Sequence, residues 1–81
     1  MKIRVVAFAT AAEALGGPEL ALDLPAESTL GELRRELAAR SPALAARMKT
    51  IAIAVDGELA NDTHALADGS EVALLPPVSG G

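Results

Sequence analysis

The sequence contains no cysteine, no tryptophan and no tyrosine, and Phe8 is its one aromatic residue. Without cysteine, the chain cannot form disulfides, bind a metal through thiolates, or hold sulfur or an acyl group on a thiol of its own. With a single aromatic ring, its core must be built from leucine, valine, isoleucine and alanine. Any covalent chemistry of this protein must therefore use another group.

The chain of 81 residues also lacks a long apolar run, a basic surplus and a glycine-rich phosphate loop. No stretch approaches the ~20 apolar residues of a membrane-spanning helix, and no charged, apolar leader opens the chain, so we expect a cytoplasmic protein. Seven basic and eleven acidic side chains give a net charge of −4, which opposes nucleic-acid binding and favours a basic partner surface. We expect one domain that does not bind ATP by itself.

Residues that could catalyse a reaction are few. The single histidine, His64, stands among turn residues without a serine or cysteine nucleophile in a recognisable arrangement, so we interpret it as a surface loop residue. The carboxylates of Asp56, Glu58, Asp62 and Asp68 do not match an EF-hand loop, and turn-forming aspartates are the simpler interpretation. The sequence thus predicts no bound metal, no bound cofactor and no self-sufficient enzyme.

Hydrophobic periodicity predicts alternating strands and helices. The expected elements are a strand over residues 2–8, a short helix from Thr10 to Gly16, a strand over 19–24, a helix from Thr29 to about Arg40, a short helix over 42–47, and strands over 51–55, 58–60 and 71–75. This order predicts an α+β fold, in which a mixed sheet has its main helix packed across one face. Val6 and Phe8 break the alternation of the first strand. We interpret them as packed beneath a loop or the tail, with an exposed patch for a partner as the alternative.

Two stretches have the spacing of a capping box, in which a threonine and a glutamate three residues later bond to each other's backbone amides. They are Thr10 with Glu13 and Thr29 with Glu32, and each is expected to begin a helix. The second of these helices has a stripe of leucines that can lie on the sheet: Leu30, Leu33 and Leu37. Its charged residues are expected on a solvated face: Arg34, Arg35, Glu36 and Arg40.

The last six residues, PPVSGG, differ from the rest of the chain. Pro76 and Pro77 donate no backbone hydrogen bond and hold φ near about −65°, so they end the preceding strand and direct the chain outward. Gly80 and Gly81 have no Cβ and can pass a narrow channel. We expect a folded domain over residues 1–75 and an extended tail over residues 76–81 that delivers the carboxyl of Gly81 to another protein. The alternative is an inert, frayed end.

Three stretches together resemble a known family: FA at residues 8–9, DGSEV at residues 68–72 and PPVSGG at residues 76–81. They are similar to the small, sulfur-carrying subunits of molybdopterin synthase. The resemblance covers essentially the whole chain, and the tail is its most specific part. It implies the ubiquitin-like β-grasp fold, in which the first and last strands are parallel neighbours in the middle of the sheet.

The resemblance also implies a sulfur carrier in molybdenum cofactor biosynthesis. A partner adenylating enzyme of the ubiquitin-activating type would use ATP to convert the carboxyl of Gly81 to an acyl-adenylate, and a sulfur donor protein would convert this to a thiocarboxylate. The tail would then enter the large subunit of molybdopterin synthase, within a heterotetramer, and donate sulfur to cyclic pyranopterin monophosphate.

Carried over by position, Gly81 would hold the sulfur and Gly80 would let the tail pass. The residues implied to contact the partner are Pro76, Pro77, Val78, Ser79, Leu75, Leu59 and Phe8. Leu75 stands where many relatives have an aromatic residue, and Ala12 stands where an arginine is frequent, so an aromatic anchor or ion pair is in doubt there. Whether Lys49 is an interface residue or a solvated lysine stays open.

Three alternative functions stay open. A carrier for thiamine, tRNA thiolation or cysteine synthesis could also end in two glycines. A ubiquitin-like protein modifier would be joined to target lysines through Gly81. An interaction module with an inert tail would tolerate an added C-terminal residue.

Overall fold

The computed structural model describes residues 1–76. Residues 77–81 lie outside the described residues, and so do the predictions made for Pro77, Val78, Ser79, Gly80 and Gly81. The elements, in chain order, are β1 (Lys2–Ala7), α1 (Ala9–Leu15), β2 (Glu19–Asp23), α2 (Leu30–Arg40), α3 (Pro42–Arg47), β3 (Ala52–Val55), β4 (Glu58–Leu59) and β5 (Glu71–Leu75). All the elements expected from the sequence are present, with boundaries shifted by one or two residues at most of them. The division into a domain over 1–75 and a tail over 76–81 stays a prediction.

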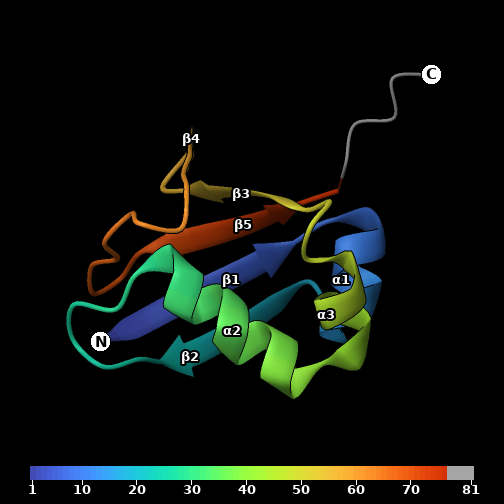
Figure 1. Ribbon diagram of the computed structural model, residues 1–81, viewed down its shortest axis with the longest axis horizontal. Helices are drawn as coiled ribbons and strands as arrows, with labels where there is room; N and C mark the ends of the chain where they lie inside the picture. The colour runs from blue at the N-terminus through green and yellow to red at the C-terminus, as the bar shows by residue number, and fades with distance from the viewer. Residues whose placement is uncertain (77–81) are drawn as a thin grey trace.

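The five strands form one mixed sheet in the order β2-β1-β5-β3-β4. β1 and β5 are parallel, whereas β1 with β2, β3 with β5 and β3 with β4 are antiparallel. Figure 1 shows α2 lying across one face of this sheet, with α1 and α3 together at one end. This arrangement confirms the predicted β-grasp fold and its parallel central pair. Among residues 1–76, no helix has both the length and the apolar character needed to cross a membrane.

The core lies between the sheet and its helices and contains no aromatic ring. Along β1, every second side chain is buried, and the same alternation recurs in β5. The leucine stripe of α2 packs onto these strands, and Leu66 fills the core from the loop after β4. The largest side chains that are fully buried are Ile3, Leu30, Leu33, Leu37, Leu44, Ile53, Leu74, Val5 and Val72. These aliphatic residues form the core that the composition predicted.

The capping box predicted at Thr10 is wrong. Helix α1 begins at Ala9, and the residue in the capping position is Phe8, whose side chain makes no capping hydrogen bond. The backbone amides of Ala11 and Ala12 donate instead to the carbonyl oxygen of Phe8. Thr10 lies inside the first turn, where its hydroxyl cannot cap, because β1 ends one residue early and Ala9 turns the chain with φ of +50°. The predicted stop at Gly16 is confirmed, since this residue has φ of +90°, which favours glycine.

The second predicted capping box is confirmed. The Thr29 hydroxyl accepts a hydrogen bond from the Glu32 amide at 3.3 Å, and the Thr29 amide donates to the Glu32 carboxylate at 3.2 Å. Both contacts stabilise the first turn of α2, whose amides otherwise have no helical partner. The solvated face predicted for this helix is correct for Arg35 and Arg40, which are exposed, but wrong for Arg34. Its guanidinium reaches across to two loops that come from distant parts of the sequence.

Candidate functional site

The ends of two central strands meet at the point where Pro76 follows the sheet. Ala7 of β1 lies beside Leu74 of β5 in parallel register, and Leu75 lies opposite Ala52 of β3. Phe8 directly follows Ala7, just as Leu75 directly follows Leu74. The strand register therefore brings the end of β5, where the predicted tail starts, beside the end of β1, which Phe8 follows, and beside the first residue of β3 (Figure 1).

An apolar row crosses the face of the sheet that lies opposite α2. Leu59 is paired with Ala54, Ala54 with Ala73, and Ala73 with Val6. Side chains directly opposite each other on neighbouring strands project from the same face. Together with the residues at the strand ends, this row forms what we name the open-face patch: Val6, Phe8, Ala52, Ala54, Leu59, Ala73 and Leu75.

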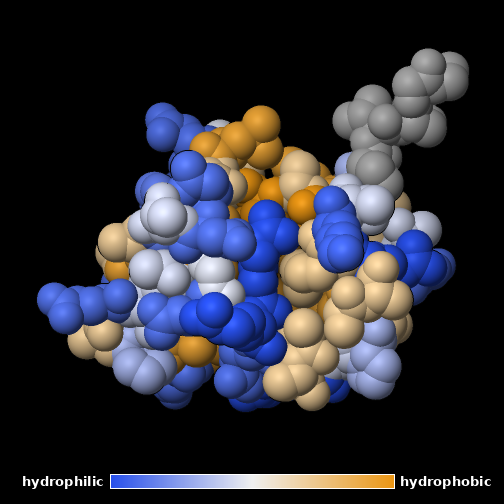
Figure 2. All heavy atoms as spheres, in the orientation of Figure 1, coloured by the Kyte–Doolittle hydropathy of each residue, from blue (hydrophilic) through white to orange (hydrophobic). Residues whose placement is uncertain are grey.

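The open-face patch contains the large apolar side chains that are most exposed to solvent. Leu59 is 74% exposed and Phe8 is 52% exposed. For Phe8, this exposure agrees with the alternative interpretation from the sequence, an exposed patch for a partner. Val6, Ala73 and Leu75 are half-buried, and Ala54 is buried. Figure 2, which views the helix-covered side, shows the most hydrophobic surface at the top, over the edge made by β3 and β4, whereas charged side chains gather over α2. Exposed apolar side chains that adjoin one another are typical of a surface that a partner covers.

Charged residues occupy the part of the open face that lies further from Pro76. Arg4 of β1 is beside Glu71 of β5 in the sheet, and its guanidinium bonds to that carboxylate. The Arg4 Nε also lies 4.0 Å from a carboxylate oxygen of Glu19 on β2. These side chains are largely exposed, so the pairs add little to stability. The open face is thus apolar near the tail and charged away from it.

Two of the four carboxylates near the turns bond to backbone amides. Asp56 accepts a hydrogen bond from the Glu71 amide at 2.9 Å, and Asp68 accepts one from the Lys2 amide at 2.7 Å. These contacts support the interpretation as turn-forming aspartates, and His64 is exposed in a loop, as expected. Among residues 1–76, no three His, Asp or Glu side chains gather where they could hold a metal, and no pocket is found. The described residues therefore offer a surface rather than a cavity for function.

The structure places four of the predicted site residues, and their roles stay predictions. Phe8, Leu75 and Pro76 lie at one end of the sheet, whereas Leu59 lies on the edge strand β4. Lys49 is exposed in the turn before β3, and its role stays open. Sequence reasoning missed the small residues that complete the open-face patch: Ala52, Ala54 and Ala73. No local signal could find them, because alanine is common on either face of a strand and only the register makes them neighbours.

Comparison with known proteins connects this geometry to a family. The ThiS family model matches residues 5–81. The chain is 41% identical to the molybdopterin synthase sulfur carrier subunit of Escherichia coli (strain K12), over 98% of this chain and 99% of that protein. The crystal structure of SAMP1 from Haloferax volcanii superposes with a TM-score of 0.89 at 32% identity, covering both chains fully.

A second structure shows a relative with its partner. It is the complex of subunits 1 and 2 of molybdopterin-converting factor from Helicobacter pylori 26695. One of its chains matches this one with a TM-score of 0.73 at 28% identity, over the full length of both. These full-length matches confirm the resemblance predicted from the sequence, and the chain belongs to the ThiS family.

Proposed function

We propose that this protein is the sulfur-carrying small subunit of a molybdopterin synthase and acts in molybdenum cofactor biosynthesis. The observation that carries the proposal is the full-length similarity to the sulfur carrier subunit of Escherichia coli. Because the sequence has no cysteine, the sulfur of such a carrier would be held on a group other than a thiol.

The group that we propose is the carboxyl of Gly81, taken as the terminal residue of the working protein. A carboxylate is a poor electrophile, because a nucleophile must attack a group that is already anionic and stabilised by resonance. An adenylating enzyme of the ubiquitin-activating type would therefore use ATP to form an acyl-adenylate at Gly81. A sulfur donor would then displace AMP and leave a thiocarboxylate, whose sulfur is a soft nucleophile. Gly80 would let this end pass a narrow channel.

We further propose that the large subunit docks on the open-face patch and receives the tail in its active site. Six residues at ~3.3 to 3.6 Å each can span roughly 20 Å, enough to reach a site well away from the docking surface. Phe8, Leu59 and Leu75 would be covered by the partner, while Pro76, Pro77, Val78 and Ser79 would line the path of the tail. The sulfur would pass to cyclic pyranopterin monophosphate, and two transfers would complete its dithiolene.

The mass of the intact protein tests this proposal. The protein is incubated with its adenylating enzyme, ATP and a sulfur source, and we expect a mass gain equal to the exchange of one oxygen for one sulfur at Gly81. A parallel reaction without ATP is the control and should leave the mass unchanged. An unchanged mass in the complete reaction, with an adenylating enzyme that charges another carrier, would contradict the proposal.

A second candidate is a protein modifier that is joined to target lysines through Gly81. The similarity to small archaeal modifier protein 1 of Haloferax volcanii favours it. An antibody against this protein would then detect a ladder of conjugates in cell extracts. Co-purification with a molybdopterin synthase large subunit, and no ladder, would favour the carrier. Co-purification with a thiazole synthase would instead indicate a carrier for thiamine.

A further inference from the structure

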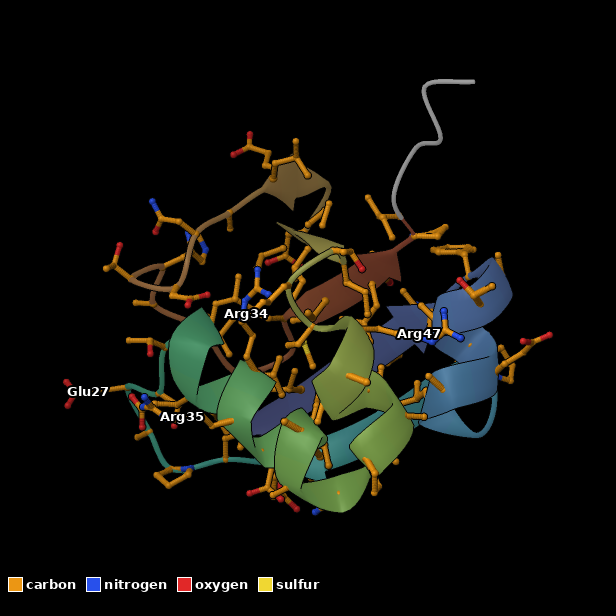
Figure 3. The ribbon with its side chains drawn as sticks, turned by 45° about the vertical axis from the view of Figure 1, so that its right-hand side comes forward. Glu27, Arg34, Arg35 and Arg47 are labelled. Carbon is orange, nitrogen blue, oxygen red and sulfur yellow. The ribbon has the colours of Figure 1, made fainter. Side chains whose placement is uncertain are left out.

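Arg34 leaves the charged face of α2 and joins two loops. Its Nη1 donates a hydrogen bond to the carbonyl oxygen of Met48 at 3.1 Å, and its Nε lies 2.6 Å from Oδ1 of Asp62. Its side chain is 22% exposed, compared with 58% for Arg4, which also forms ion pairs. Figure 3 shows Arg34 directed from α2 toward the segments that flank β3, whereas Arg35 points the other way. The Asp62 side chain is 62% exposed, so the ion pair by itself adds little, and it is the mostly buried Arg34 side chain that joins the two loops.

Asp62 is also held against α2 by its backbone. Its carbonyl oxygen accepts a hydrogen bond from the Gly31 amide at 3.0 Å. A Cβ at Gly31 would lie 3.1 Å from the Cβ of Asp62, so a glycine allows this close approach. The neighbouring amide of Leu30 donates to the His64 carbonyl oxygen at 2.9 Å. The loop after β4 is therefore clamped to the first turn of α2 at several points.

These contacts hold the two ends of the segment that supplies one side of the open-face patch. Met48 comes four residues before Ala52, at the start of β3, and Asp62 comes three residues after Leu59. β4 has two residues and pairs only with β3 among the described strands. So short a strand is weakly held by its own ladder. The position of Leu59 must depend on how the following loop is anchored.

We infer that Arg34 is a positioning residue for partner docking, and this inference rests on the proposed function. By holding Met48 and Asp62 against α2, Arg34 fixes Leu59 and Ala52 on the opposite face of the sheet. It acts through these residues and does not itself touch the partner, because α2 and the open-face patch lie on opposite sides of the sheet (Figure 1). The guanidinium suits this role, since it donates a hydrogen bond to the Met48 carbonyl oxygen while its charge attracts the Asp62 carboxylate, although its Nε–H has no hydrogen-bond partner among residues 1–76.

A double-mutant cycle tests the inference. The dissociation constant for the molybdopterin synthase large subunit of the same organism is measured for the wild type, Arg34→Met, Leu59→Ala and the double variant. We expect Arg34→Met to weaken binding by roughly three- to tenfold and to have no further effect once Leu59 is alanine. Arg35→Met is the matched control on the same helix and should leave binding unchanged. If the two substitutions weaken binding independently, so that their fold losses of affinity multiply in the double variant, the inference is overturned. It is also overturned if Arg34→Met does not weaken binding.

Amide exchange of the free protein separates this inference from the proposed function. Arg34→Met should speed exchange at Ala60, whose amide donates to Ile53, while exchange in β1 and β5 stays as in the wild type. Faster exchange everywhere would mean global destabilisation and would overturn the positioning role. If Arg34→Met does not fold, Asp62→Ala replaces it, because this variant leaves the backbone contact to Gly31 in place. Asp62→Ala should likewise speed exchange at Ala60. Failure of the wild type to bind the large subunit would instead contradict the proposed function. The exchange at Ala60 would still decide whether Arg34 anchors β4.

Discussion

Leu74 and Ala7 lie beside each other in parallel register in the middle of the sheet, although they come from opposite ends of the chain. Both are buried against the helices. Their successors, Leu75 and Phe8, therefore reach the same end of the molecule. The proposed docking surface thus adjoins the start of the tail, so docking of the open-face patch would also direct the tail into the partner.

Leu74 and Leu75 are neighbours in sequence with opposite expected roles. Leu74 is fully buried, so Leu74→Ala should lower the free energy of unfolding by about 2–5 kcal/mol through lost burial and a cavity. Leu75→Ala should cost much less, because this side chain is half-buried on the open face, and should weaken binding of the large subunit instead. Urea denaturation and calorimetric titration measure the two effects. Equal losses of stability would show that the faces are misassigned.

Phe8 should contribute to partner binding more than to stability. Its ring is half exposed, so Phe8→Ala should change the free energy of unfolding by less than about 1 kcal/mol. If the ring is covered on docking, the same variant should weaken binding by about tenfold or more, as truncated aromatic contacts at interfaces commonly do. Ala39→Ser, on the exposed side of α2, is the control. Unchanged affinity for Phe8→Ala would remove this residue from the docking surface.

The two threonines with capping-box spacing should respond differently to the same substitution. Thr29→Ala should destabilise the protein by about 1 kcal/mol, because the Glu32 amide loses its acceptor. Thr10→Ala should be neutral or slightly stabilising, since Thr10 lies within α1, where alanine has the higher helix propensity. Thermal unfolding of both variants gives the comparison. A loss at Thr10 as large as at Thr29 would contradict the capping assignment of α1.

An added residue after Gly81 should abolish sulfur transfer and leave the fold intact. The extension displaces the proposed reactive carboxyl, and it touches no residue of the core. Product formation in a reconstituted synthase and the melting temperature are measured together. The same tag at the N-terminus serves as the control for bulk. Sulfur transfer at the normal rate from the extended protein would place the reactive group elsewhere.

Predictions from the sequence were most accurate where local patterns decide the structure. The alternation in β1, the leucine stripe of α2 and the glycine at the end of α1 each depend on neighbouring residues. The capping box at Thr10 failed because its spacing cannot show where the preceding strand ends. The solvated face expected for Arg34 failed because Met48 and Asp62 come from distant parts of the chain.

The sequence by itself determined an aliphatic core, the order of helices and strands, and a chemistry that cannot use a thiol, because these follow from residue type and local period. The tertiary structure alone decided that Leu59, Ala54, Ala73 and Val6 form one row and that Arg34 anchors the loops behind it. The physical reason is that periodicity specifies which face of its own element a side chain occupies. Strand order, register and helix docking specify which side chains from distant elements become neighbours.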